Sequence, residues 1–426
     1  MKNVLMIVFV FMSEAAVSQE ILSDRIKGLR VVSELRAGFP AVIPGSKGIA
    51  VEFDTDDVHP ADFRIRYFHC DRRWNKTGTS FINDEARNTT RMPLQYEQAP
   101  AGVQRYRWRY TAQMPGHFDI QRFSFSGNYV FEIWEDGGAL PLASGRFLVS
   151  EGVVSLAMRV VNRQIPSKEN PFNKAHRVDV QFTIPETVQR PTPFSGNGFD
   201  AGAGQQEFLI PMFVSTVDVY KNRELYRYER IDANERTPET FVDGLGTRRV
   251  RFSIDNILPG NEYRRLNTRN IDHYPPGGTL RIRGGADVSR MLFRSPSDRN
   301  GLSSLVQGDR YADYLSIQFE YLDEARDPDD QMYVVGDFNG WKTGPSSLMS
   351  YDDALGRFVW TASLRRGEYD YQYVLADDWI ALEGNDWRTV NVYSAVVYYR
   401  DERYGGFDRI LGFVQGTNAA QNEATE

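Results

Sequence analysis

The sequence predicts an all-β fold built of tandem β-sandwich modules of the immunoglobulin-like or early-set type. Apolar and polar residues alternate with a period of two along many short segments, as in strands with one buried face and one wet face. No segment of helical length places apolar residues at i, i+3, i+4 and i+7. A chain of 426 residues with 41% hydrophobic residues is long enough for two or three domains, each with its own core.

The alternating segments occur along the whole chain. The clearest examples are residues 63–67, 105–110, 177–184, 315–321 and 369–375. Arginine fills many of their polar positions, and long arginine stems can lie across neighbouring aromatic rings and shield the wet face of a sheet. We therefore expect these arginines to lie on the outer faces of the sheets.

Residues 1–18 have the layout of a secretory signal peptide. Lys2 precedes a short apolar run, and Ala16-Val17-Ser18 provides a small-x-small cleavage site. The apolar run is too short to span a bilayer, and no other stretch approaches the required length. Cys70 is the single cysteine, so no intramolecular disulfide is expected. We expect an exported, soluble protein that does not insert into a membrane.

Turn-rich and polar gaps suggest the domain boundaries. We expect an N-terminal β-sandwich at residues 19–152 and a middle β domain at residues 153–308. A C-terminal immunoglobulin-like, glycogen-binding-like sandwich then follows at residues 309–415, and residues 416–426 form a disordered tail.

Composition and motifs argue against several functions. The net charge of −7 and a pI near 5.5 disfavour nucleic acid as a partner. His69 and Cys70 are adjacent strand residues that point to opposite faces, so they do not suggest a metal site. Residues 196–201 formally fit a dinucleotide fingerprint, but prolines precede them where a buried strand is required. With no Gly-x-Ser-x-Gly motif either, we expect no enzyme activity, cofactor or metal.

The segment Gly336-Asp-Phe-Asn-Gly-Trp341 places a tryptophan after a strand and a Gly/Asn turn. Such a tryptophan stacks on a sugar ring, anchors a protein interface or folds back over its own sandwich. Residues 333–387 resemble the glycogen-binding modules attached to starch-active enzymes. This resemblance implies that Trp341 and Trp379 are the sugar-stacking tryptophans and that Gln372 replaces a glycan-binding lysine. These three are the candidate interaction residues, and a periplasmic carbohydrate-binding protein is the alternative function.

A second resemblance extends between residues 69 and 412. The segments that carry it are His69-Cys70-Asp71 with Trp74, Ser126–Val130, Arg146–Val149, Gly260–Arg264, Tyr311–Tyr314, Gly336–Trp341, Gly367–Tyr373, Glu383–Asn385, Asn391–Tyr393, Tyr398–Arg400 and Phe407–Gly412. Each segment is weak alone, but in this order they are similar to the plug protein family of type IX secretion, from the Bacteroidetes lineage. The chain departs from the family pattern at Lys221 and Tyr263, where we expect glutamine and phenylalanine.

The second resemblance implies a binding protein of the periplasm, peripherally associated with an outer-membrane β-barrel translocon whose periplasmic opening it seals. An interface that seals and still releases should bury roughly 1,000–2,000 Å² with many polar groups. Because Gln372 departs from the glycan-binding pattern, we favour this function over sugar binding.

Overall fold

The computed structural model describes residues 20–116, 120, 122–164, 174–190, 205–282, 284–291 and 312–418. The predicted signal peptide, the segment at 196–201 and residues 419–426 of the predicted tail lie outside these ranges. The expectation that the tail begins at residue 416 is wrong, because the last strand extends through Thr417 and Asn418 is buried. The described residues form strands and four short 3₁₀ turns, and none of their helices is long and apolar enough to cross a bilayer. The prediction of an all-β fold of β-sandwich modules is therefore confirmed.

The N-terminal sandwich consists of two mainly antiparallel sheets that pack face to face. The first sheet has the order β1-β9-β8-β5, with the short β3 parallel to β9; the second has the order β2-β4-β7-β6. The strands are β1 (Glu20–Ile21), β2 (Lys27–Ser33), β3 (Ala41–Val42), β4 (Ile49–Thr55), β5 (Phe63–Cys70), β6 (Gln95–Gln98), β7 (Trp108–Met114), β8 (Gly127–Glu135) and β9 (Ala143–Val149). The inward-facing aliphatic and aromatic side chains of the two sheets form one core, as period-two alternation requires.

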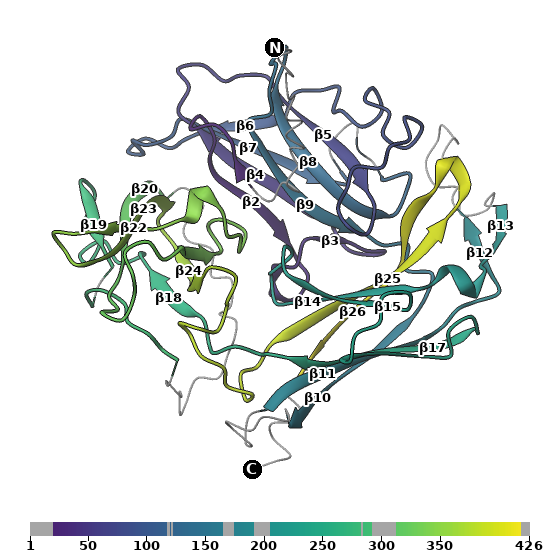
Figure 1. The fold of residues 1–426 in the computed structure, drawn as a ribbon. Coiled ribbons are helices and arrows are strands. Elements are labelled where there is room, and N and C mark those ends of the chain that lie inside the picture. Colours follow the sequence, from purple (N-terminus) through teal and green to yellow (C-terminus); the bar gives the residue numbers. More distant parts are fainter. Residues whose placement is uncertain are drawn as a thin grey trace, which may run out of the picture.

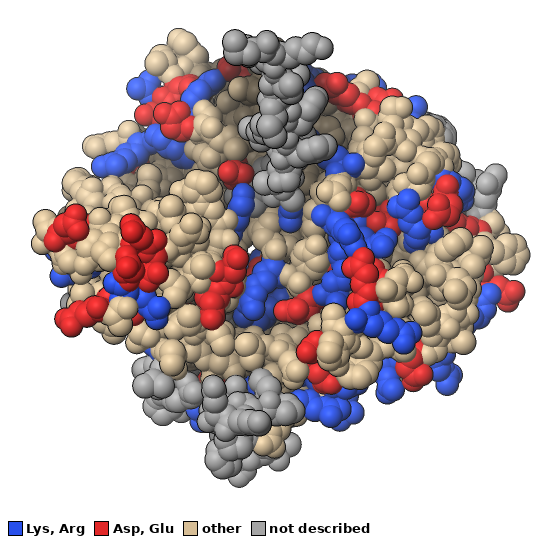
Figure 2. Space-filling model, in the orientation of Figure 1, with Lys and Arg blue, Asp and Glu red and all other residues tan. Residues whose placement is uncertain are grey.

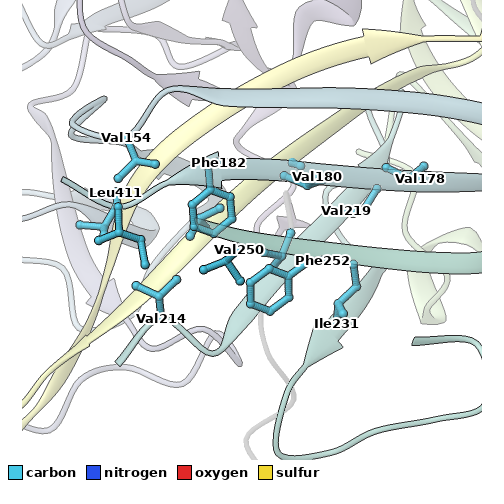
Figure 3. Close-up of a cluster of buried hydrophobic side chains, with 14 of the residues drawn as sticks. Val154, Val178, Val180, Phe182, Val214, Val219, Ile231, Val250, Phe252 and Leu411 are labelled. Atoms are coloured by element: carbon cyan, nitrogen blue, oxygen red, sulfur yellow. The ribbon is translucent and has the colours of Figure 1, made fainter. Parts of the chain in front are cut away.

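The middle sandwich pairs strands that lie far apart in the chain. One sheet has the order β10-β11-β17-β16 and the other has the order β15-β14-β25-β26. The strands are β10 (Leu156–Gln164), β11 (Lys174–Thr183), β14 (Thr216–Lys221), β15 (Tyr228–Asp232), β16 (Thr240–Asp243), β17 (Arg249–Ile257), β25 (Val392–Asp401) and β26 (Phe407–Thr417). Side chains from β11, β17 and β26 lie together in its core (Figure 3). A hairpin of β12 (Thr187–Arg190) and β13 (Gln205–Phe208) extends from one end.

The two sheets of the middle sandwich approach closely where β26 passes β10. A Cβ atom placed on Gly412 would lie 2.5 Å from the Val154 carbonyl oxygen, inside any real contact distance. Glycine is therefore required at this crossing because the backbone of one sheet touches the backbone that leads into the other.

The third sandwich is inserted between β17 and β25. Its sheets have the orders β18-β24-β21 and β19-β20-β23-β22. The strands are β18 (Arg264–Asn267), β19 (Thr279–Arg281), β20 (Tyr314–Tyr321), β21 (Met332–Gly336), β22 (Ser350–Asp352), β23 (Arg357–Arg365) and β24 (Glu368–Leu375). Its core is rich in aromatic residues of β20 and β24, which the sequence places in alternating register.

The expected boundary between residues 308 and 309 is wrong. β18 and β19 come before it, yet they pair with β24 and β20 of the third sandwich. β25 and β26 come after it, yet they complete the middle sandwich by pairing with β14. Alternation identifies a strand and its buried face but carries no information about which distant strand becomes its neighbour.

The three sandwiches lie against one another (Figure 1). In that view the N-terminal sandwich lies above the middle one, and the inserted sandwich lies to the left of both. A separate apolar cluster joins the first two: Phe39, Cys70 and Trp74 of the N-terminal sandwich pack against Tyr220 and Tyr398 of the middle one.

Candidate functional site

Trp341 is buried and does not project from the surface. Asn339 shapes the turn before it by accepting from the Gly336 N–H (2.9 Å) and donating to the Val334 carbonyl (2.8 Å). The backbone of Trp341 then adopts φ 61°, which directs its ring onto Tyr263 with the ring centroids 4.2 Å apart. The indole N–H donates to Asp337 (3.1 Å), and only 2% of the residue is exposed. Of the three roles that the sequence left open, the structure supports a tryptophan folded back over its own sandwich.

Trp379 and Gln372 do not form a sugar platform with Trp341 either. Trp379 is half-buried beside the same cluster, and the guanidinium carbon of Arg227 lies 5.0 Å from its ring centroid. Gln372 lies opposite Val335 in the sheet and is 6% exposed. The structure brings the two tryptophans into one cluster, in which the ring of Trp341 is buried against Tyr263 and is not available for stacking on a glycan.

A groove nevertheless runs beside Trp379, with a volume of about 580 Å³. The strand-turn segment Tyr226–Arg230 forms one wall, and the loop Trp341–Thr343 forms another. Its cationic groups are paired: Arg230 with Asp218 (2.7 Å) and Lys342 with Glu20 of the N-terminal sandwich (3.3 Å). The groove therefore combines aromatic surface with neutralised charge at the place where the sandwiches meet.

A buried polar network joins the N-terminal and inserted sandwiches. Asp54 at the end of β4 is fully buried and accepts from Arg109 (2.9 Å), from the Tyr314 hydroxyl (2.8 Å) and from Arg365. Arg109 also donates to the Tyr106 hydroxyl at 3.2 Å. One carboxylate thus holds side chains from both sandwiches, which is the arrangement that makes a buried charge tolerable.

The position of Arg109 corrects one expectation. The alternation in residues 105–110 predicts an outward-facing arginine, but Arg109 is 2% exposed because the inserted sandwich covers this face. Arg66 does follow the expectation, since its guanidinium lies 4.2 Å from the ring centroid of Trp134.

The turn after β14 links the middle and inserted sandwiches. Asn222 donates to the Tyr263 hydroxyl (3.0 Å), and Arg223 pairs with Asp337 (2.9 Å). The fully buried carboxylate of Glu224 accepts from the Tyr263 hydroxyl and lies 3.3 Å from Lys221 Nζ. Lys221 and Tyr263, the two departures from the plug family pattern, therefore meet at one carboxylate.

Another buried pair joins the N-terminal and middle sandwiches. Arg409 of β26 is 3% exposed and donates through two nitrogens to Glu151, at 2.7 and 2.8 Å. It also contacts Glu207 (2.9 Å) and Asp401 (3.2 Å), and these carboxylates raise its pKa against the opposing effect of burial. Each of the three interfaces between sandwiches thus contains buried charged groups that are fixed by ion pairs and charge-assisted hydrogen bonds.

His69 and Cys70 are both buried. Burial lowers the pKa of His69 to about 4, and its ring nitrogens lie 2.8 Å from Thr77 Oγ1 and 3.0 Å from the Ser126 carbonyl. Burial raises the pKa of Cys70 to about 12. Over the residues that the structure describes, no cluster of histidine, cysteine and acidic side chains is arranged to hold a metal ion.

Residues 26–151 match the family model described as "Type 9 secretion system plug protein 1st domain". The N-terminal sandwich belongs to the type IX secretion plug family. This family assignment supports a role in type IX secretion, with association to an outer-membrane component of the secretion system, and suggests a periplasmic or envelope location. The likeness of residues 333–387 to glycogen-binding modules stays a prediction.

A solved structure shares the fold of nearly the whole chain. It is a hypothetical protein from Parabacteroides merdae, with a TM-score of 0.71 and 19% identity, and the match covers 95% of this chain and 100% of that protein's chain. At this identity the likeness concerns the fold alone. A search of curated proteins gave no significant match.

Sequence reasoning missed the residues that join the sandwiches. Asp54, Arg365 and Glu224 appeared as ordinary strand or turn residues, because burial between domains leaves no mark on local alternation. The one available signal was the density of arginine beside tyrosine, as at Tyr106 and Arg109, which occurs where the N-terminal and inserted sandwiches touch.

Proposed function

We propose that this protein is a periplasmic plug that binds the outer-membrane β-barrel translocon of type IX secretion and seals its periplasmic opening. The observation that carries the proposal is the family match over residues 26–151. In this proposal the protein acts by binding another protein and not by catalysis.

The architecture supports such a role. A plug in a wide pore has to resist deformation, and this chain joins its three sandwiches through buried charged networks centred on Asp54, Glu224 and Arg409. Interfaces between domains of one chain permit relative motion unless they are extensive and well packed. Here the apolar cluster around Phe39 and Tyr220 adds packing to the polar contacts.

Co-purification tests the binding step. The tagged mature protein should retain the translocon barrel from an outer-membrane extract of its own organism, whereas a β-sandwich protein of similar size and charge should not. Failure to retain the barrel under conditions that preserve the translocon would contradict the proposal.

Permeability tests the sealing step. Deleting the gene should admit solutes that the outer membrane normally excludes, and deleting the barrel gene as well should restore exclusion. Unchanged permeability in the single deletion, with the pore present, would count against sealing.

Binding of the same purified protein to immobilised α-glucan tests the alternative function, carbohydrate binding. Because Trp341 is buried and Arg227 lies beside the Trp379 ring, we expect no retention on immobilised α-glucan. Retention that Trp379→Ala abolishes would instead support the glycan function.

A further inference from the structure

A cavity of about 130 Å³ lies where the three sandwiches meet. β2 contributes residues 30–32, the turn after β14 contributes residues 223–226, and the inserted sandwich contributes residues 337–341 and 365–369. In Figure 1 the ends of β2, β14 and β24 surround the centre of the molecule, and Figure 2 shows acidic and basic side chains gathered around a hollow there. Any group bound in this cavity would touch all three sandwiches.

Basic groups outnumber acidic groups around this cavity. The described residues that line it include the arginines Arg30, Arg146, Arg223, Arg365 and Arg366. The acidic residues that line it are Asp337 and Glu368. Asp337 already pairs with Arg223 (2.9 Å), and Glu368 pairs with Arg269, which is not part of the lining (2.8 Å). Three of the arginines also pair with carboxylates that do not line the cavity: Arg30 with Glu52 (2.6 Å), Arg223 with Asp370 (3.0 Å) and Arg365 with Asp54. The lining itself is therefore mainly basic, although these arginines are partly neutralised from outside it.

Several donors of these arginines are unused. Arg365 donates through Nη2, while its Nε and Nη1 have no hydrogen-bond partner, although the residue is only 6% exposed. Nε of Arg223 and Nε of Arg30 are likewise buried without a partner. An unsatisfied buried donor is destabilising, and more so when the group is charged, so an acceptor here would be stabilising.

The arginines of the lining differ in their electrostatic surroundings. Burial, and after it the neighbouring Arg365, lowers the pKa of Arg30, and burial lowers the pKa of Arg366, whereas Tyr314 and Asp54 raise the pKa of Arg365 against the effect of burial. Arg366 donates to the carbonyl oxygens of Thr268 and Tyr274, both at 2.8 Å. Arg146 lies between the rings of Trp74 and Tyr226, at 4.4 and 4.7 Å.

We propose that this cavity binds a small oxyanion, as a free carboxylate or phosphate compound, and that the bound anion joins the three sandwiches. Planar guanidinium forks match the two-oxygen face of a carboxylate or phosphate. Arg30 of β2, Arg223 of the β14 turn and Arg365 before β24 supply these forks from one sandwich each. This proposal goes beyond the plug function, since it concerns the purified protein without its translocon.

Thermal unfolding of the whole mature protein tests the site, with inorganic phosphate and malonate as probes. At constant ionic strength, either probe should raise the midpoint by several degrees over chloride in a saturable way. Arg30→Gln should weaken the apparent Kd about tenfold, as expected for losing one charged hydrogen-bonding group. Whether phosphate, malonate or both raise the unfolding midpoint shows which class of oxyanion the site accepts.

Arg64→Gln is the matched control. Arg64 is 24% exposed and paired with Asp136, much as Arg30 is 28% exposed and paired with Glu52, but Arg64 does not line the cavity. Anions also stabilise proteins by general exclusion from their surfaces. An equal rise in the wild type and in both variants would identify that general effect and would overturn the proposal, as would the absence of any rise.

Val32→Glu provides a second variant should Arg30→Gln fail to fold. Val32 lines the cavity, so the new carboxylate would serve as a tethered anion. We expect this variant to lose the response to phosphate and malonate while remaining at least as stable as the wild type in chloride. A full anion response in a folded Val32→Glu protein would contradict the site.

Discussion

Replacing Asp54 by alanine should separate the N-terminal and inserted sandwiches. The Asp54 carboxylate is fully buried, and its removal leaves Arg109 and Arg365 buried at 2% and 6% exposure without their shared partner. Breaking a buried ion pair by removing one partner costs about 3–5 kcal/mol, because the remaining charge is uncompensated. The Tyr314 hydroxyl also loses its acceptor, so we expect the upper half of that range.

Urea unfolding, together with hydrogen exchange of β20 and β23, measures this loss. Because a three-domain chain need not unfold in two states, the exchange rates of the two interface strands show whether the interface opens first. Asp136→Ala is the control, since Asp136 pairs with Arg64 at 53% exposure and its removal should change stability little. A loss for Asp54→Ala that is no larger than the loss for the control would refute the argument that this network holds the two sandwiches together.

Three further outcomes follow from buried groups. Gly28→Ala should destabilise the protein strongly, because Gly28 has φ +56° and a Cβ atom there would lie 2.1 Å from the Tyr314 hydroxyl oxygen. In a double-mutant cycle, Tyr314→Phe should recover part of this loss, and strict additivity of the two substitutions would argue against the contact. His69 and His176 have pKa values lowered to about 4, so the unfolded chain takes up protons first as the pH falls below 6.5. Stability should therefore be full above pH 6.5 and decline towards pH 4, by at most about 3 kcal/mol per histidine, and a flat urea midpoint over that range would contradict this. The Cys70 thiol, with its pKa raised to about 12, should react with a maleimide at pH 8 only after unfolding, and prompt labelling of the native protein would show that its cluster is open.

Local patterning determined what the sequence could predict. Alternation in residues 63–67, 177–184 and 315–321 identified strands that the structure contains, because each pattern depends only on which face of one strand is buried. The resemblance to plug proteins likewise depended on short segments, and the family match over residues 26–151 supports it.

The orientation of the Trp341 side chain could not be predicted from local patterning. A Gly/Asn turn followed by Trp341 is compatible with a ring on either side of the loop, and the hydroxyl-bearing ring of Tyr263 decides the outcome from 78 positions away in the chain. The same limit applies to Asp54, whose three partners come from β7, the start of β20 and the end of β23. Partners brought together by tertiary folding leave no periodic signal in a single sequence.

The insertion of the third sandwich between β17 and β25 also constrains the order in which the chain can fold. Thr216 of β14 lies opposite Tyr398 of β25, so the second sheet of the middle sandwich stays incomplete until residues 392–417 are present. Contacts this distant in sequence slow folding and leave strand edges exposed meanwhile. During synthesis, the N-terminal sandwich can form early, whereas residues 392–417 follow the inserted sandwich and complete the middle one. Loss of those strands would leave β14 without a neighbour on one side and would remove the second point of attachment of the inserted sandwich.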